Sequence, residues 1–354
     1  MNRMKNIGIL TSGGDCPGMN TAVRAAVFAA REKGMKLYGI QQGFQGLYDG
    51  NWEELTIDKV DAIHAQGGTM LRTARFMPLV NEETRQAAVD QCIAQCKGKL
   101  DGLIVIGGDG SFKGARALSL NNLPCVCLPG TIDNDISCTE YTIGYDTALN
   151  MVMNMADAVA DTARSHDRCI LIEVMGNKAG DLTLYGGMAS GATAVVTMEY
   201  GGFDFPESGE MAPAEVERFE QTLVDRLHVA KAAGKNYYLV FVAEGITGKK
   251  DKQGLTRYPG GVEKLAQVVQ QKSGIETRAN ILAYVQRGGI PTARDRVMAT
   301  QMGAYAVNLL SQGTANRVVV SVCGEIKDYD ILEGLNMQKA AHPQDYDLAW
   351  RVSL

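Results

Sequence analysis

Short, unbroken apolar runs recur along the chain, and most are followed by a glycine-rich or polar turn. The runs that we expect to be strands are 7–10, 36–40, 103–106, 126–128, 169–174, 237–243, 281–285 and 318–322. Helical patterns separate many of them, near 20–33, 112–119, 147–163 and 294–310. Unbroken apolar strands that alternate with helices predict an α/β fold built on parallel sheets buried on both faces. In such folds, ligands collect outside the carboxyl ends of the strands, so we expect the polar loops to converge there.

Composition narrows the class of protein. At 354 residues the chain is long enough for two domains, and its apolar content of 45% is ordinary for a globular protein. The net charge is −5 and the basic residues are scattered, so we expect no nucleic-acid partner. No apolar run has the ~18 residues of a membrane span, and the first ten residues lack a signal-peptide pattern. We therefore expect no membrane partner and a cytoplasmic location.

Cysteine and histidine offer little chemistry. None of the eight cysteines forms a Cys-x-x-Cys pair, and Cys125, Cys127 and Cys169 lie inside apolar runs. We interpret them as buried, reduced thiols. The four histidines show no ligand spacing, so neither a histidine zinc site nor a Ser-His-Asp triad is expected.

Three polar loops carry the chemistry, and each follows an apolar run. They are 12–15 (Ser-Gly-Gly-Asp), 107–111 (Gly-Gly-Asp-Gly-Ser) and 129–135 (Pro-Gly-Thr-Ile-Asp-Asn-Asp). Glycine backbone can approach a phosphate closely, and a helix that starts after such a loop favours an anion. Of the two carboxylates in 133–135, one can accept a proton while the other organises a divalent cation. Together the loops predict phosphoryl transfer, although each loop alone is compatible with an ordinary turn.

With these loops in this order, the chain resembles the bacterial-type ATP-dependent 6-phosphofructokinases nearly from end to end. The resemblance rests on the residues of 10–20, 67–69, 74–76, 106–111, 129–135, 173–176, 276–278 and 286–289. It implies two similar three-layer α/β domains with mostly parallel sheets and an active site in the cleft between them. The larger, ATP-binding domain would comprise 1–144 plus 286–335, and the smaller, sugar-phosphate domain 145–285 plus 336–354.

The resemblance also implies a reaction and a set of site residues. ATP and fructose 6-phosphate would give ADP and fructose 1,6-bisphosphate, with Mg²⁺, in a homotetramer. By matching position, ATP would be held by Gly14, Arg75, Phe76, Asp109, Gly110, Ser111 and Gly114. Mg²⁺ would be organised by Asp109 and Asp135, and the catalytic positions would be Asp133, Thr131 and Asn177. The sugar phosphate would be bound by Thr131, Asp133, Met175, Gly176, Asn177, Glu244, Tyr284 and Arg287, with Arg168 and Arg278 reaching in from a neighbouring subunit.

The chain departs from the family pattern at several positions. Asn177 stands where the family has an Arg that stabilises the transferring group, and Lys178 follows it. Tyr284 stands where His is frequent. The positions that bind effector phosphates in relatives hold Arg24, Phe28, Ile57, Ala62, Ala160 and Thr193, so we expect weak or absent control by ADP or phosphoenolpyruvate. The insertion 248–261 has no assigned role.

Other functions compete with this one. Pyrophosphate-dependent relatives usually carry Asp at position 110 and Lys at 130, where this chain has Gly110 and Gly130, which favours ATP as the donor. An alternative-sugar kinase of the same fold is a related possibility. A non-catalytic regulatory paralogue would explain Asn177, but the intact Asp109, Asp133, Asp135 and Arg287 argue against it. A nicotinamide dehydrogenase is remote because the Gly-x-Gly-x-x-Gly fingerprint is missing.

Overall fold

The computed structural model describes residues 4–199, 203, 205–207, 209–248, 257–340 and 342–352. The chain divides into two compact units, each of which is built from separate segments. Unit 1 comprises Met1–Ile132, Ile136–Thr147 and Arg287–Ala340, and unit 2 comprises Asp133–Asp135, Ala148–Gln286 and Ala341–Leu354. The domain boundaries expected from the sequence stay a prediction, because compactness does not test whether either part folds alone.

Unit 1 is built on a seven-stranded sheet in the order β11-β10-β5-β4-β1-β2-β3. The strands are β1 (Asn6–Thr11), β2 (Lys36–Ile40), β3 (Trp52–Glu54), β4 (Gly102–Gly107), β5 (Cys125–Pro129), β10 (Arg317–Val322) and β11 (Glu325–Asp330). The central five are parallel, and only the edge strands β3 and β11 run antiparallel to their neighbours. The predicted parallel α/β sheet is therefore confirmed.

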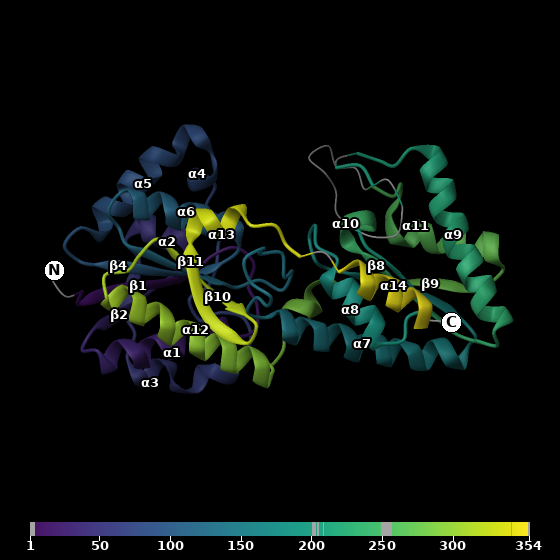
Figure 1. The fold of residues 1–354 in the computed structure, drawn as a ribbon, viewed down its shortest axis with the longest axis horizontal. Coiled ribbons are helices and arrows are strands. Elements are labelled where there is room, and N and C mark those ends of the chain that lie inside the picture. Colours follow the sequence, from purple (N-terminus) through teal and green to yellow (C-terminus); the bar gives the residue numbers. More distant parts are fainter. Residues whose placement is uncertain are drawn as a thin grey trace. The chain divides into compact units, whose positions relative to one another are not determined.

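Helices cover both faces of this sheet (Figure 1). On one face lie α2 (Phe44–Asp49), α4 (Met77–Val80), α5 (Glu82–Cys96), α6 (Asp109–Leu120) and α13 (Ile331–Asn336). On the other lie α1 (Met19–Glu32), α3 (Ile57–Val60), the 3-10 turn η1 (Asp61–Ala65) and α12 (Ala293–Ser311). Helices α1 and α12 approach so closely that a Cβ on Gly303 would lie 2.5 Å from the Ala22 carbonyl oxygen. The sheet is thus buried on both faces, as its apolar strands require.

Unit 2 contains a four-stranded parallel sheet in the order β7-β8-β6-β9. Its strands are β6 (Cys169–Val174), β7 (Ala194–Val196), β8 (Tyr238–Ala243) and β9 (Thr277–Ile281). Around them are α7 (Tyr145–Ser165), α8 (Asp181–Ala189), α9 (Pro213–Ala232), α10 (Glu244–Thr247), α11 (Gly261–Ser273), η2 (Ala283–Arg287) and α14 (Pro343–Val352). The first three residues of α7 belong to unit 1, and the last residue of η2 does as well.

One expected strand is placed wrongly by the apolar pattern. We expected a strand at 281–285, whereas the strand is β9 and 283–287 form the 3-10 turn η2. Ala283 has a φ of 45°, which turns the chain out of the extended conformation. The apolar side chains of Tyr284 and Val285 are exposed, so hydrophobicity alone gave the wrong strand boundaries here.

All eight cysteines are free thiols and seven of them are buried as expected, whereas Cys323 is exposed. Cys125, Cys127 and Cys169 are fully buried, and burial raises the pKa of each.

Among the described residues, no helix is both long and apolar enough to cross a membrane. Most of the insertion 248–261, namely residues 249–256, lies outside the described part of the chain.

Candidate active site

Three strand-end loops of unit 1 meet at one edge of its sheet. Strands β1, β4 and β5 are parallel neighbours, so their carboxyl ends lie together. The loops are also joined directly: the Ser12 N–H donates to the Ile106 carbonyl at 2.9 Å, and the Gly130 N–H donates to the Gly107 carbonyl at 3.0 Å. The expected convergence of the loops that begin at Ser12, Gly108 and Gly130 is thus present within unit 1.

The loop after β4 leads into the N-terminus of α6, where Asp109 is the first helical residue and is exposed. A Cβ added to Gly108 or Gly110 would meet no atom within 4 Å. By contrast, a Cβ on Gly107 would lie 2.5 Å from the Ser12 carbonyl oxygen. Packing inside the protein therefore explains the glycine at 107 but not those at 108 and 110. The space beside them, at the N-terminus of a twelve-residue helix, suits an anion.

Arg287 lies against the first of these loops. A Cβ on Gly14 would lie 2.4 Å from Nη1 of Arg287, and this nitrogen donates to the Asp15 carbonyl at 3.2 Å. The resemblance assigned Gly14 to ATP and Arg287 to the sugar phosphate. Within unit 1 the two residues are in contact, so Gly14 also makes room for an arginine.

The segment that carries Arg75 and Phe76 is fixed to the same loop region. The Thr11 hydroxyl donates to the Arg72 carbonyl and the Thr73 hydroxyl donates to the Gly13 carbonyl, both at 2.8 Å. The Arg75 side chain is exposed. The Phe76 ring is buried, and its centre lies 5.3 Å from the centre of the Tyr48 ring.

The remaining nucleotide positions, Ser111 and Gly114, are packed inside unit 1. Ser111 is buried, and its N–H donates to the Gly108 carbonyl at 2.9 Å. A Cβ on Gly114 would lie 3.1 Å from the Phe44 ring, so this glycine permits α6 to pack on α2. The nucleotide roles of Phe76, Ser111 and Gly114 stay predictions.

In the loop 129–135, Asn134 has a structural role that was not predicted from the sequence. Asn134 is buried, has a φ of 51°, and donates through Nδ2 to Oδ2 of Asp181 at 2.9 Å. Asn tolerates the left-handed conformation better than most residues, so an Asn between two acids in a loop was a sequence indication of a positive φ at this position. Asp133 and Asp135 flank it and are half-buried. Just upstream, the Thr142 hydroxyl donates to the Thr131 carbonyl at 2.6 Å and fixes the start of the loop.

The loop after β6 carries Met175, Gly176 and Asn177, and side chains from elsewhere in unit 2 hold its backbone. Oε1 of Glu244 accepts from the N–H groups of Gly176 at 3.2 Å and of Asn177 at 2.8 Å. Oε1 of the fully buried Gln286 accepts from the Met175 N–H at 3.1 Å. The sequence brought Glu244 to notice as a sugar ligand, but it gave no indication that Glu244 and Gln286 shape the loop.

A buried carboxyl group lies beneath this loop. Glu173, near the end of β6, accepts a hydrogen bond from the Thr247 hydroxyl at 2.6 Å. Burial is the main cause that raises its pKa, and the neighbouring Glu244 raises it further. A Cβ on Gly248 would lie 2.4 Å from Oε1 of Glu173, so this carboxyl is closely packed and we interpret it as structural.

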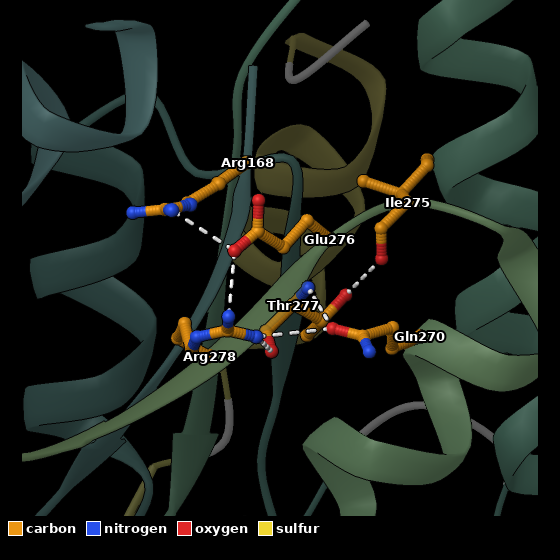
Figure 2. A network of polar contacts seen from close by, with 6 residues as sticks. All are labelled: Arg168, Gln270, Ile275, Glu276, Thr277 and Arg278. Atoms are coloured by element: carbon orange, nitrogen blue, oxygen red, sulfur yellow. Dashed lines mark hydrogen bonds and ion pairs between the residues drawn. The ribbon is translucent and has the colours of Figure 1, made fainter. Parts of the chain in front are cut away.

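The three remaining sugar-phosphate positions lie at the surface of unit 2. The Tyr284 side chain is exposed, at 80% of its surface. Arg168 and Arg278 both form ion pairs with Glu276 (Figure 2). Their role at a neighbouring subunit's site stays a prediction.

In the described part of the chain, no group of three or more His, Cys, Asp or Glu side chains could hold a metal ion by itself. This arrangement still fits Mg²⁺, which is usually bound by one or two carboxylates together with substrate phosphates rather than by a protein cage. The exposed carboxylate of Asp109 beside the open backbone of Gly110 offers donors of the right chemistry.

Parallel sheets with glycine loops, a helix N-terminus and carboxylates at the strand ends define an α/β protein built to bind phosphorylated ligands. A sequence model of the family described as phosphofructokinase matches residues 6–310. The chain belongs to the phosphofructokinase family.

Individual relatives agree with this assignment. The ATP-dependent 6-phosphofructokinase of Alkaliphilus metalliredigens is 41% identical over 351 residues, which cover 99% of this chain and 100% of the relative. The enzyme of that name from Clostridium acetobutylicum is 42% identical over 350 residues, with the same coverage. Among solved structures, phosphofructokinase from Saccharomyces cerevisiae matches with a TM-score of 0.78 and 30% identity, over 94% of this chain. This chain spans 45% of the length of that yeast chain.

Proposed function

We propose that this protein transfers the γ-phosphoryl group of ATP to the 1-hydroxyl of fructose 6-phosphate, giving fructose 1,6-bisphosphate and ADP. The main structural support is the open space beside Gly108 and Gly110 at the N-terminus of α6, next to the Asp109 carboxylate. Two full-length relatives named ATP-dependent 6-phosphofructokinase support the same activity. Such an enzyme belongs to glycolysis and would act in the cytoplasm.

Each unit supplies part of what the reaction needs. In unit 1, the loops at Gly14 and at 108–111, with Arg75, would bind the nucleotide. Asp109 and Asp135 are the carboxylates that we assign to Mg²⁺, which supplies neutralisation of the phosphate charge when it is bound. In unit 2, the Met175–Asn177 loop, Glu244 and Tyr284 would bind the sugar phosphate, together with Arg287. Arg168 and Arg278 would complete the site of a neighbouring subunit in a homotetramer.

Asp133 is the proton acceptor in this proposal. The oxygen of the sugar 1-hydroxyl forms a bond to the γ-phosphorus, the bond from that phosphorus to the β-phosphate oxygen breaks, and the hydroxyl proton passes to the Asp133 carboxylate. Thr131 contacts the transferring group. Phosphoryl transfer needs little covalent help from a protein, so positioning and charge stabilisation supply most of the catalysis. The anchoring of Asn134 to Asp181 supports this assignment, because it fixes the backbone between the two acids.

Packing around Gly130 argues against pyrophosphate as the donor. A Cβ at this position would lie 2.8 Å from Cγ2 of Ile106 and 3.2 Å from Cε of Met19. The lysine that pyrophosphate-dependent relatives usually carry here would therefore displace core side chains. A Cβ at Gly110 would meet no protein atom within 4 Å, so the protein itself has room for an Asp side chain there. An Asp at this position would instead occupy the space that we assign to ATP.

A coupled assay tests the function. Purified protein with Mg²⁺, ATP and fructose 6-phosphate should form ADP and fructose 1,6-bisphosphate, and the D133S variant should lose most turnover while it still binds both substrates. Pyrophosphate in place of ATP should give no product. Protein that binds ATP but turns over neither donor would instead favour a regulatory paralogue.

A further inference from the structure

Two arginines of unit 2 share a single carboxylate oxygen. Arg168 directly precedes β6, and Arg278 is the second residue of β9, which pairs with β6 in parallel. Oε1 of Glu276 lies 2.9 Å from Nη2 of Arg168 and 2.6 Å from Nη2 of Arg278. Figure 2 shows both guanidinium groups reaching the same oxygen of this carboxylate, Arg168 from the left and Arg278 from below.

The Arg278 guanidinium is held at a second point as well. Its Nη1 donates to Oε1 of Gln270 and to the Thr277 carbonyl, both at 3.1 Å. The same Gln270 oxygen accepts from the Thr277 N–H at 3.0 Å, which ties the end of α11 to the start of β9 (Figure 2). Contacts on two sides leave the Arg278 side chain little rotational freedom.

The network is poorly suited to stabilising the fold. The side chains of Arg168, Glu276 and Arg278 are 27%, 39% and 54% exposed, and ion pairs in such positions contribute little to stability. Nε of Arg168 is buried and forms no hydrogen bond within the described part of the chain, so this arginine is not fully satisfied. The arrangement instead brings two cations together, which repel each other unless a negative charge lies between them.

We propose that Glu276 is a positioning residue for phosphate recognition, which holds the Arg168 and Arg278 guanidinium groups beside each other so that both donate to the 6-phosphate of the sugar. The proposal rests on the proposed function and on the phosphate-binding role of the two arginines. Each guanidinium has five N–H donors, and Glu276 occupies only one nitrogen of each, so donors remain for a phosphate. Holding these flexible side chains in place reduces the entropy that is lost when the phosphate binds.

Glu276 keeps its charge under assay conditions. The hydrogen bond from Arg168 is the main cause that lowers its pKa, and the charges of Arg168, Arg278 and His166 lower it further. A neutral side chain at this position would leave the two guanidinium groups to repel each other and separate.

The test compares E276A and E276Q with a matched control, E217Q. Glu217 is also a surface carboxylate of unit 2 paired with a cation, Lys272 at 2.7 Å, but it contacts neither arginine. We expect E276A to raise KM for fructose 6-phosphate about tenfold or more, with kcat and KM for ATP within about twofold of wild type. The contacts to the 6-phosphate stabilise the ground state and the transition state equally, so their loss weakens substrate binding without slowing the chemical step. E276Q should have a smaller effect in the same direction, and E217Q none.

A double-mutant cycle separates positioning from an independent role. In an R278A background, E276A should raise KM by clearly less than it does in wild type, because one of the two arginines through which Glu276 acts is already gone. A thermal melt confirms that each variant is folded, and if E276A is not, E276Q and E276D carry the same test.

The possible outcomes are distinct. An unchanged or lower KM for fructose 6-phosphate in E276A, or an effect that adds in full on R278A, overturns the inference; a lower value would show that Glu276 competes with the phosphate. Wild-type protein that does not phosphorylate fructose 6-phosphate overturns the proposed function and this inference with it. Active wild type with an unaffected E276A overturns this inference alone.

Discussion

Asp295 of α12 binds Thr147 of α7 through both the backbone and the side chain. Oδ2 of Asp295 accepts from the Thr147 N–H at 2.8 Å and from its hydroxyl at 2.5 Å, and Oδ1 accepts from the Gly144 N–H at 2.9 Å. At the same junction, the Thr292 hydroxyl donates to Asp146 at 2.6 Å. Asp295 therefore caps the N-terminus of α7, and its side chain is fully buried there.

Burial of Asp295 predicts a specific dependence of stability on pH. Burial is the main cause that raises its pKa to about 6, although the hydrogen bonds from Thr147 and Gly144 oppose the shift. Because the folded pKa lies above the unfolded value of ~3.9, the stabilising contribution is complete below about pH 4 and is lost as the pH rises through about 6. The free energy of unfolding of wild type relative to D295N should fall by up to ~3 kcal/mol between pH 4 and pH 7.

Urea unfolding of both proteins at several pH values in this range measures that difference. D295N keeps one oxygen acceptor but does not titrate. It therefore removes the contribution of residue 295 to the pH dependence of the free energy of unfolding, while the contributions of all other titratable groups are the same in both proteins. A difference that stays constant across the range would show that Asp295 titrates normally.

Gly110 should separate stability from activity. It is the second residue of α6, and a Cβ there would meet no protein atom within 4 Å. G110A should therefore leave the free energy of unfolding unchanged or raise it by ~0.5–1 kcal/mol, the usual gain for Gly to Ala in a helix. It should also raise KM for ATP about tenfold or more, because the methyl group occupies the space that we assign to a phosphate. KM for fructose 6-phosphate is the internal control, and a normal KM for ATP would contradict the assignment.

Most sheet strands and the loops after them could be predicted from the sequence, because a short apolar run followed by a glycine-rich or polar turn is a local pattern. Loops at Ser12, Gly108 and Gly130 meet because parallel neighbouring strands bring them together, and apolar runs reveal such strands. The roles of Gln286 and of Glu244 in holding the Met175–Asn177 loop were not predictable, because they depend on contacts between segments far apart in the chain. The strand predicted at 281–285 was wrong for a related reason. Most of its apolar side chains are exposed, but in the sequence they cannot be distinguished from those of a buried strand.

Asn177 should limit the rate of phosphoryl transfer. The family has Arg here, and loss of one charge-stabilising donor lowers kcat by roughly 10²–10³-fold in other enzymes. N177R should raise kcat at least about tenfold, with little change in KM for ATP. The loop should survive the change because the bond from Glu244 is made to the backbone N–H of residue 177, which an arginine keeps. The φ of 57° costs Arg only about 1–2 kcal/mol.

Steady-state kinetics of N177R, K178A and the double variant test this. An unchanged kcat in folded N177R, together with a strong loss in K178A, would show that the exposed Lys178 already supplies the charge. If neither variant changes kcat, charge at these two positions does not limit the reaction.

Arg24 should be unable to bind an effector phosphate on its own. Its Nη2 lies 2.8 Å from Oδ1 of Asp61, its Nε donates to the Asp61 carbonyl at 3.0 Å, and its guanidinium carbon lies 4.4 Å from the centre of the Phe28 ring. With Ile57 and Ala62 in place of charged residues nearby in the sequence, one engaged arginine would have to hold a polyanion alone. Saturation curves for fructose 6-phosphate should therefore be hyperbolic and unchanged by ADP or phosphoenolpyruvate, beyond competition of ADP with ATP. R24A should match wild type in these curves, and a sigmoidal curve that ADP abolishes in wild type but not in R24A would show instead that this arginine leaves Asp61 to bind the effector.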